Sequence, residues 1–125
     1  MSLELKAKQV KENYSVFSLG YCDATHILQR NNKAGYTAGV YGWNSDIFTF
    51  NDVAVSTGYR PFHNVTDKQN EEGKKIIMKY EKKAEKAEKS FDAKKYNYNY
   101  SKLYKKLETL YIKMFQELKQ ILINE

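Results

Sequence analysis

Residues 36–58 read YTAGVYGWNSDIFTFNDVAVSTG and contain the clearest β signal in the chain. Aromatic and β-branched residues gather in three short runs, 36–41, 45–50 and 53–57, and Gly58 ends the last run. The second and third runs are separated only by Asn51 and Asp52, residue types that tolerate the positive φ of a two-residue hairpin turn. The stretch therefore predicts a three-stranded antiparallel meander.

The preceding residues predict one more strand and two short helices. Residues 14–19, YSVFSL, resemble a strand that Gly20 ends and that could join the meander. Residues 3–12 have an amphipathic helical pattern, and residues 23–29 form a second helical pattern with Asp23 as N-cap and with Ile27 and Leu28 facing inward. A sheet with one apolar face needs a helical layer to cover it.

The second half of the chain predicts long helices. Residues 74–125 contain no Gly, Pro, Cys, His, Arg or Trp, and Gly73 is the last residue that breaks helices. Apolar residues follow a heptad pattern in two runs. The first comprises Gly73, Ile77, Tyr80, Ala84, Ala87 and Phe91, and the second Leu103, Leu107, Leu110, Met114, Leu118 and Ile121, widened by Tyr104, Tyr111, Phe115 and Leu122.

Residues 96–100 read YNYNY, and their asparagines lower helix propensity between the two runs. We therefore predict an α+β fold, in which a small antiparallel sheet of three to four strands with a short helix is followed by a long C-terminal helical hairpin, broken near residues 92–100. The alternative is one continuous helix of about 50 residues that dimerises as a coiled coil.

Length and composition indicate a small globular protein. The chain has 125 residues, 42% of them hydrophobic and 14% aromatic, which excludes a disordered chain. We expect one domain, with a sheet region over residues 1–65 and a helical hairpin or coiled-coil extension over residues 66–125. A single cysteine excludes an internal disulfide. No apolar run approaches the ~18–20 residues of a membrane span, and the N-terminus lacks the apolar core of a signal peptide. A cytoplasmic location is the expectation.

The net charge of +6 is concentrated in the second half, where residues 66–125 carry fifteen lysines and ten acidic residues. Such a field favours an anionic partner, either nucleic acid or an acidic protein. The alternative is a lysine-rich solvated helix with no partner. The same region has no arginine, the usual bidentate reader of guanine, which argues against base-specific recognition.

Cys22 and His26 are the candidate catalytic residues. Their spacing of four places both on one face of a helix, where the imidazole could take the thiol proton. Alternatively Cys22 is a small buried apolar residue, and the neighbouring Asp23 disfavours a thiolate. The His, Cys and acidic residues match no zinc spacing, and the glycines match no phosphate-binding loop. We therefore predict no metal and no cofactor.

Two further segments are candidate binding sites. In the first half, Trp43 lies at a strand junction and Tyr59, Arg60 and His63 follow the last strand; exposed, Trp43 would anchor an interface, and Arg60 could receive a carboxylate or phosphate. The alternatives are a core Trp43 and an Arg60 that pairs with Asp46 or stacks on a ring.

The other candidate segment lies between the two predicted helices. It interleaves basic and aromatic residues as single-strand binders do: Lys94, Lys95, Tyr96, Tyr98, Lys102, Lys105 and Lys106. The alternative is an amphipathic helix start, with Tyr100 and Tyr104 on the buried stripe and only Tyr96 and Tyr98 near solvent.

Three short motifs carry a resemblance: SLGYC at residues 18–22, YGWNSD at 41–46 and TGYRPF at 57–62. Together they resemble a motif set in small uncharacterised proteins of low-GC Gram-positive bacteria and their plasmids, phages and integrative elements. The resemblance covers residues 14–64. It implies a mobile-element context and assigns no reaction and no site residue.

The sequence therefore predicts a non-enzymatic binding module with nucleic acid or an acidic protein as partner. A small cysteine-dependent enzyme using Cys22 and His26 is the alternative from another class, and a structural coiled-coil adaptor is the third. A homodimer through the C-terminal helices is a further expectation.

Overall fold

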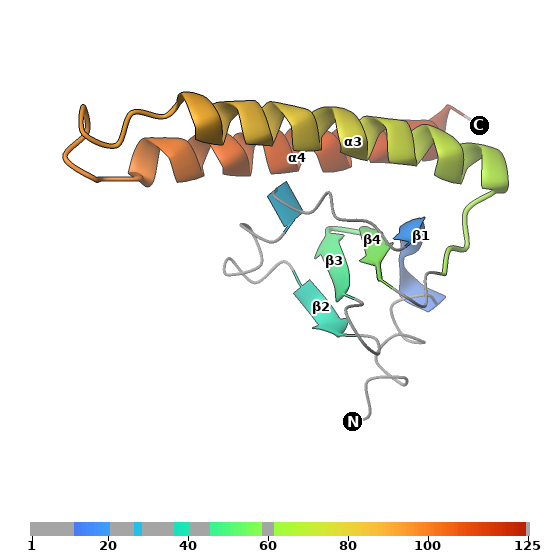
Figure 1. Ribbon diagram of the computed structural model, residues 1–125. Coiled ribbons are helices and arrows are strands. Elements are labelled where there is room, and N and C mark those ends of the chain that lie inside the picture. Colours follow the sequence, from blue (N-terminus) through green and yellow to red (C-terminus); the bar gives the residue numbers. More distant parts are fainter. Residues whose placement is uncertain (1–11, 21–26, 29–36, 41–45, 59–61, 125) are drawn as a thin grey trace.

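The computed structural model describes residues 12–20, 27–28, 37–40, 46–58 and 62–124. Its strands are β1 (Ser15–Gly20), β2 (Thr37–Val40), β3 (Asp46–Phe50) and β4 (Val53–Thr57), and its long helices are α3 (Asp67–Ser90) and α4 (Ser101–Ile123). Figure 1 shows the two helices as an antiparallel pair lying across one face of the sheet. The chain is therefore α+β with a C-terminal helical hairpin, as predicted.

The sheet has the order β1-β4-β3-β2. Strands β2, β3 and β4 form the predicted antiparallel meander, and Asn51, with a φ of 56°, turns the chain between the paired residues Phe50 and Val53. Strand β1 joins the edge of β4 in parallel, so the prediction of an antiparallel sheet is wrong for this pair. A parallel pair needs a long crossover, and the whole meander lies between β1 and the end of β4.

The sheet buries both faces. Phe17, Phe48 and Val55 face the hairpin and share one core cluster with residues of both helices, including Ile77 and Tyr111. On the opposite face, Val16, Ile47 and Ala54 are fully buried. The alternation along β1 and β4 follows the period of two that a strand imposes on its side chains.

Two asparagine side chains bind the outer edge of β1. Asn64 accepts from the Val16 N–H at 2.8 Å and donates to the Tyr14 carbonyl at 2.9 Å. Asn70, in the first turn of α3, accepts from the Ser18 N–H at 2.7 Å and donates to the Ser18 carbonyl at 3.2 Å. These primary amides stand where a further strand would pair, and thereby close an edge that could otherwise recruit another chain.

Helix α3 begins before Gly73. Thr66 is its N-cap in a reciprocal capping box with Gln69, which satisfies two backbone N–H groups. Gly73 therefore lies inside the helix, so its assignment as a helix breaker is wrong. A Cβ at Gly73 would collide with the Phe17 ring, 2.8 Å from Cε1. The close approach of α3 to β1 explains a glycine that helix propensity alone disfavours.

The helices α3 and α4 are separate, so the alternative of one continuous helix is wrong. The intervening turn ends in a Schellman motif: the Tyr98 N–H donates to the Ala93 carbonyl at 2.7 Å and the Asn97 N–H to Lys94 at 3.1 Å. Asn97 adopts the required positive φ of 52°. The Asn99 side chain then accepts from the Ser101 N–H at the start of α4. Both asparagines thus stabilise the turn that separates the two helices.

The short helices expected in the first half lie largely outside the described residues. This holds for nearly all of residues 3–12 and for most of residues 23–29. Ile27 and Leu28 are described, are helical and are fully buried, in agreement with their predicted inward orientation. The Ile27 N–H donates to the Glu81 carboxylate of α3 at 3.1 Å, which connects this segment to the hairpin.

Candidate functional site

Among the candidate residues of the first half, His63 is described by the structure and the other five are not. Outside the described residues lie Cys22, His26, Trp43, Tyr59 and Arg60, so their catalytic and binding roles stay predictions. The described strand ends that precede residues 21–26 and 59–61 are neighbours, because the Gly58 N–H donates to the Gly20 carbonyl at 3.0 Å. His63 is half-buried and its Nε2 lies 3.0 Å from the Asp67 carboxylate, in the first turn of α3.

In the described part of the chain, no group of three or more His, Cys, Asp or Glu residues could hold a metal ion. None of the described helices has the length and apolar character needed to cross a membrane.

All candidate residues of the second half lie at the distal end of the hairpin, beyond the strands (Figure 1). We call residues 91–104 the hairpin tip. Lys94, Lys95 and Lys102 are exposed there, and Lys105 and Lys106 are exposed in the next turn of α4. These residues are also close together in the sequence, and their role in binding stays a prediction.

Four rings form a continuous aromatic array at the hairpin tip. Phe91 stacks on Tyr96, with ring centroids 5.3 Å apart and planes at 7°, and lies 5.4 Å from Tyr100. Tyr100 in turn stacks on Tyr104 at 6.1 Å and 27°. The Lys102 Nζ lies 5.0 Å from the centroid of Tyr96, within range of a cation–π interaction.

The exposure of these tyrosines corrects the sequence interpretation. Tyr100 is 40% exposed and Tyr104 is 52% exposed, so neither lies on the buried stripe that the alternative of an amphipathic helix start required. Tyr96, expected near solvent, is half-buried by its ring contacts. Tyr98 is 63% exposed, as expected. Sequence spacing did not predict the exposure of Tyr100 and Tyr104. Helix α3 ends at Ser90, and the small side chain of Ala87 covers little of their surface.

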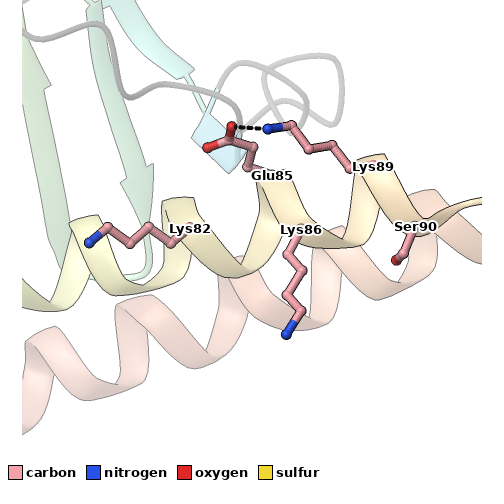
Figure 2. A pocket seen from close by; sticks show the side chains of 5 residues that line it. All are labelled: Lys82, Glu85, Lys86, Lys89 and Ser90. Atoms are coloured by element: carbon pink, nitrogen blue, oxygen red, sulfur yellow. Dashed lines mark ion pairs between the residues drawn. The ribbon is translucent and has the colours of Figure 1, made fainter.

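Five exposed lysines follow one face of α3: Lys75, Lys79, Lys82, Lys86 and Lys89. Their alternating spacing of four and three residues keeps them within a sector of about 80° over about 21 Å of helix. We call this row the lysine stripe. Figure 2 shows its distal part, where Lys82, Lys86, Lys89, Glu85 and Ser90 line a shallow groove of about 420 Å³. In Figure 2 the side chains of Lys82 and Lys86 point in different directions, whereas Lys89 is directed to the Glu85 carboxylate.

Lysines near the sheet form ion pairs more often than lysines in the distal half of the hairpin. Near the sheet, Lys119 binds Asp52 at 3.0 Å, and Lys79 binds Glu117 at 2.8 Å. In the distal half, Lys89 pairs with Glu85 at 2.8 Å. Within the described part of the chain, the remaining distal lysines make no ion pair: Lys82, Lys83, Lys86, Lys94, Lys95, Lys102, Lys105 and Lys106. Lys68, Lys75 and Lys113 likewise make no ion pair among the described residues, so unpaired positive charge is most concentrated in the distal half but is not confined to it.

A polar network of Lys79, Tyr80 and Glu117 connects α3 and α4 near the middle of the hairpin. Burial raises the pKa of Tyr80 to about 12, and the neighbouring Glu117 carboxylate adds to the shift. For Glu117, burial is the largest influence and favours the protonated form. Hydrogen bonds from Lys79 and Tyr80, with the charges of Lys79 and Lys83, together outweigh it, so the pKa of Glu117 is lowered. The pKa of Asp52 is lowered too, chiefly by its hydrogen bond with Lys119.

These two carboxylates predict a loss of stability in acid. A lowered folded-state pKa means that the contribution is complete above the ordinary values of 4.5 for Glu117 and 3.8 for Asp52. It is lost as the pH falls through the folded-state values. Urea unfolding between pH 7 and pH 3 should show this decline, and Glu117→Gln should flatten it by up to about 1 kcal/mol.

The matched control is Glu108→Gln, which changes an exposed carboxyl on the same helix. It should leave the acid dependence of stability unchanged. An acid slope for Glu117→Gln equal to that of the unsubstituted protein would contradict the role given to this network.

No family model, no curated protein and no solved structure matches the chain.

Proposed function

We propose that this protein is a nucleic-acid-binding module that holds the phosphate backbone along the distal half of its helical hairpin. The observation that carries the proposal is the distribution of charge. Residues 82–106 contain nine lysines and three acidic residues, an excess equal to the net charge of the whole chain, +6. A phosphate backbone is the polyanion that such an extended positive surface fits.

Two of the three acidic residues of this region have partners close in sequence. Glu85 pairs with Lys89, and the Asp92 carboxylate accepts from the Lys94 and Lys95 backbone N–H groups. The Glu88 side chain is half-buried. Most of the lysines therefore keep their charge available for phosphates, and binding would release the counterions that phosphates otherwise condense.

The helical hairpin contains lysines but no arginine, which indicates how it would bind nucleic acid. Lysine contacts phosphate as a flexible point charge, whereas arginine is the usual bidentate reader of guanine. We therefore propose binding with little base-sequence preference, through the backbone. We further propose a cytoplasmic location, because nucleic acids are accessible there and the single cysteine fits a reducing compartment.

Replacing Lys82 and Lys86 together with glutamine should weaken binding and reduce its salt dependence. Each phosphate contact contributes about −0.7 to the slope of log K against log salt for a single strand. Losing two contacts should therefore reduce the slope by about 1.4. Fluorescence anisotropy with a labelled oligonucleotide, titrated from about 50 to 300 mM salt, measures both quantities.

The matched control is the pair Lys68→Gln and Lys75→Gln. It removes the same net charge from exposed positions outside the distal half. A control with an equal loss of slope would assign the effect to overall charge and contradict the proposed surface. Absence of oligonucleotide binding at low salt would overturn the function itself and leave an acidic protein as the better partner.

A further inference from the structure

We infer that the hairpin tip takes single-stranded nucleic acid, with unpaired bases stacked on the exposed rings of Tyr98, Tyr100 and Tyr104. The inference rests on the proposed function and specifies its ligand. An unpaired base offers its flat face to a side chain, whereas a base inside a duplex hides both faces in the stack. Stacking on aromatic rings beside a basic track is the mode by which proteins bind single strands without reading their sequence.

The exposure of these rings is the first support. Among the described tyrosines, Tyr80 and Tyr111 are buried in the core, while Tyr98, Tyr100 and Tyr104 are 63, 40 and 52% exposed. The three belong to one short stretch at the hairpin tip. Large apolar side chains gathered on a surface usually mark a contact site.

The array also holds its rings in place before any ligand arrives. Phe91 is half-buried and contacts both Tyr96 and Tyr100, so a half-buried ring packs against Tyr100, one of the three exposed rings. Tyr104 extends the row from Tyr100 along the first turn of α4, at a spacing of four residues. A base that stacks on Tyr104 would lengthen an existing stack, so little side-chain freedom is lost on binding.

The lysines lie where the backbone of a stacked strand would pass. Lys102, Lys105 and Lys106 leave α4 within two residues of Tyr104, and Lys94 and Lys95 leave the turn before Tyr98. Each nucleotide carries one phosphate beside its base. Lysines on both sides of the tyrosines could therefore contact the phosphates of a strand whose bases stack on the rings.

The backbone at Tyr98 gives an independent reason. Its φ is 60°, directly after Asn97 at 52°. Asn97 has its explanation in the Schellman motif, but a bulky aromatic residue in the left-handed region is an outlier that glycine would relieve. Strained backbone that persists at an exposed aromatic residue is typical of a functional position.

The test compares Tyr98→Gly and Tyr104→Ala with the conservative variant Tyr104→Phe. The probes are a labelled oligothymidine of about 15 nucleotides and a duplex of equal length, at low salt. Tyr98→Gly should raise the melting temperature of the protein and yet weaken oligothymidine binding about tenfold. Tyr104→Ala should weaken it about tenfold, Tyr104→Phe should retain it, and duplex affinity should change less than about twofold for all three.

The outcomes separate the two proposals. Tight oligothymidine binding that no tyrosine variant weakens would overturn the inference, while the proposed function would stand on the lysine variants. Equal losses on oligothymidine and duplex would also overturn it, because stacking on unpaired bases would not then be the cause. Failure to bind either probe would overturn both. A gain in stability together with a selective loss of single-strand affinity is the result that a merely structural Tyr98 would not produce.

Discussion

Replacing Asn70 with alanine is expected to lower the free energy of unfolding by about 3 kcal/mol. The Asn70 side chain is 4% exposed and binds both the N–H and the carbonyl of Ser18, a buried residue of β1. Each backbone group left buried without its partner costs about 1–3 kcal/mol, and water reaches neither group easily. Urea unfolding followed by circular dichroism at pH 7 measures the loss.

Asn64→Ala is the matched control for this prediction. The Asn64 amide makes the same pair of bonds along the same strand, to Val16 and Tyr14, but Asn64 is exposed. Water can replace its amide, so the loss should stay below about 1 kcal/mol. Asn70→Asp retains an acceptor for the Ser18 N–H but faces the Ser18 carbonyl with a charge, so it should not restore stability. A loss for Asn70→Ala as small as that for Asn64→Ala would contradict the account.

Local pattern predicted the elements of this fold well. The Asn51-Asp52 turn and three short runs of aromatic and β-branched residues indicated the meander, and heptad spacing identified the buried positions Ile77, Leu107 and Leu118. The break between the helices also followed from local chemistry, since Asn97 and Asn99 favour caps over helix interiors. Each of these features depends on residues close together in the chain.

The features that were missed depend on residues far apart. The direction of β1 is set by the path of the chain between Gly20 and β4, not by the strand itself. The amides of Asn64 and Asn70 find their partners 48 and 52 residues away, at a strand edge that sequence does not reveal. Burial of Tyr100 and Tyr104 was wrongly predicted from spacing, because spacing does not report where the opposing helix ends.

The same distinction applies to the candidate site. The lysine and tyrosine residues of the hairpin tip could be proposed from sequence because charge and ring type are visible there. Which of the rings are exposed, and which lysines keep their charge unpaired, emerged only from the packing of α3 on α4. The contacts of β1 with Asn70 and Gly73 direct the start of α3, so the sheet orients the far end of the hairpin as well.

Gly73→Ala is expected to destabilise the protein by about 1–2 kcal/mol, although alanine is the better helix former. The new Cβ would overlap Cδ1 of Phe17 and lie 2.8 Å from Cε1, and the Phe17 ring is fully buried. Overpacking of this kind costs about 2–3 kcal/mol, against a gain of about 1 kcal/mol in helix propensity. Urea unfolding at pH 7 gives the net value.

The sign of this effect should reverse when the ring is removed. Phe17→Val is itself destabilising because it leaves a cavity, but it lacks the ring atoms that the new Cβ would meet. In that background Gly73→Ala should add about 1 kcal/mol of stability through helix propensity alone. A double-mutant cycle thus isolates the close approach of α3 to β1 from the intrinsic preference of the helix. Glu72→Ala, at the exposed neighbouring position, should stay within about 0.5 kcal/mol in both backgrounds. If Gly73→Ala destabilised both backgrounds equally, the Phe17 contact would not be the reason for the glycine.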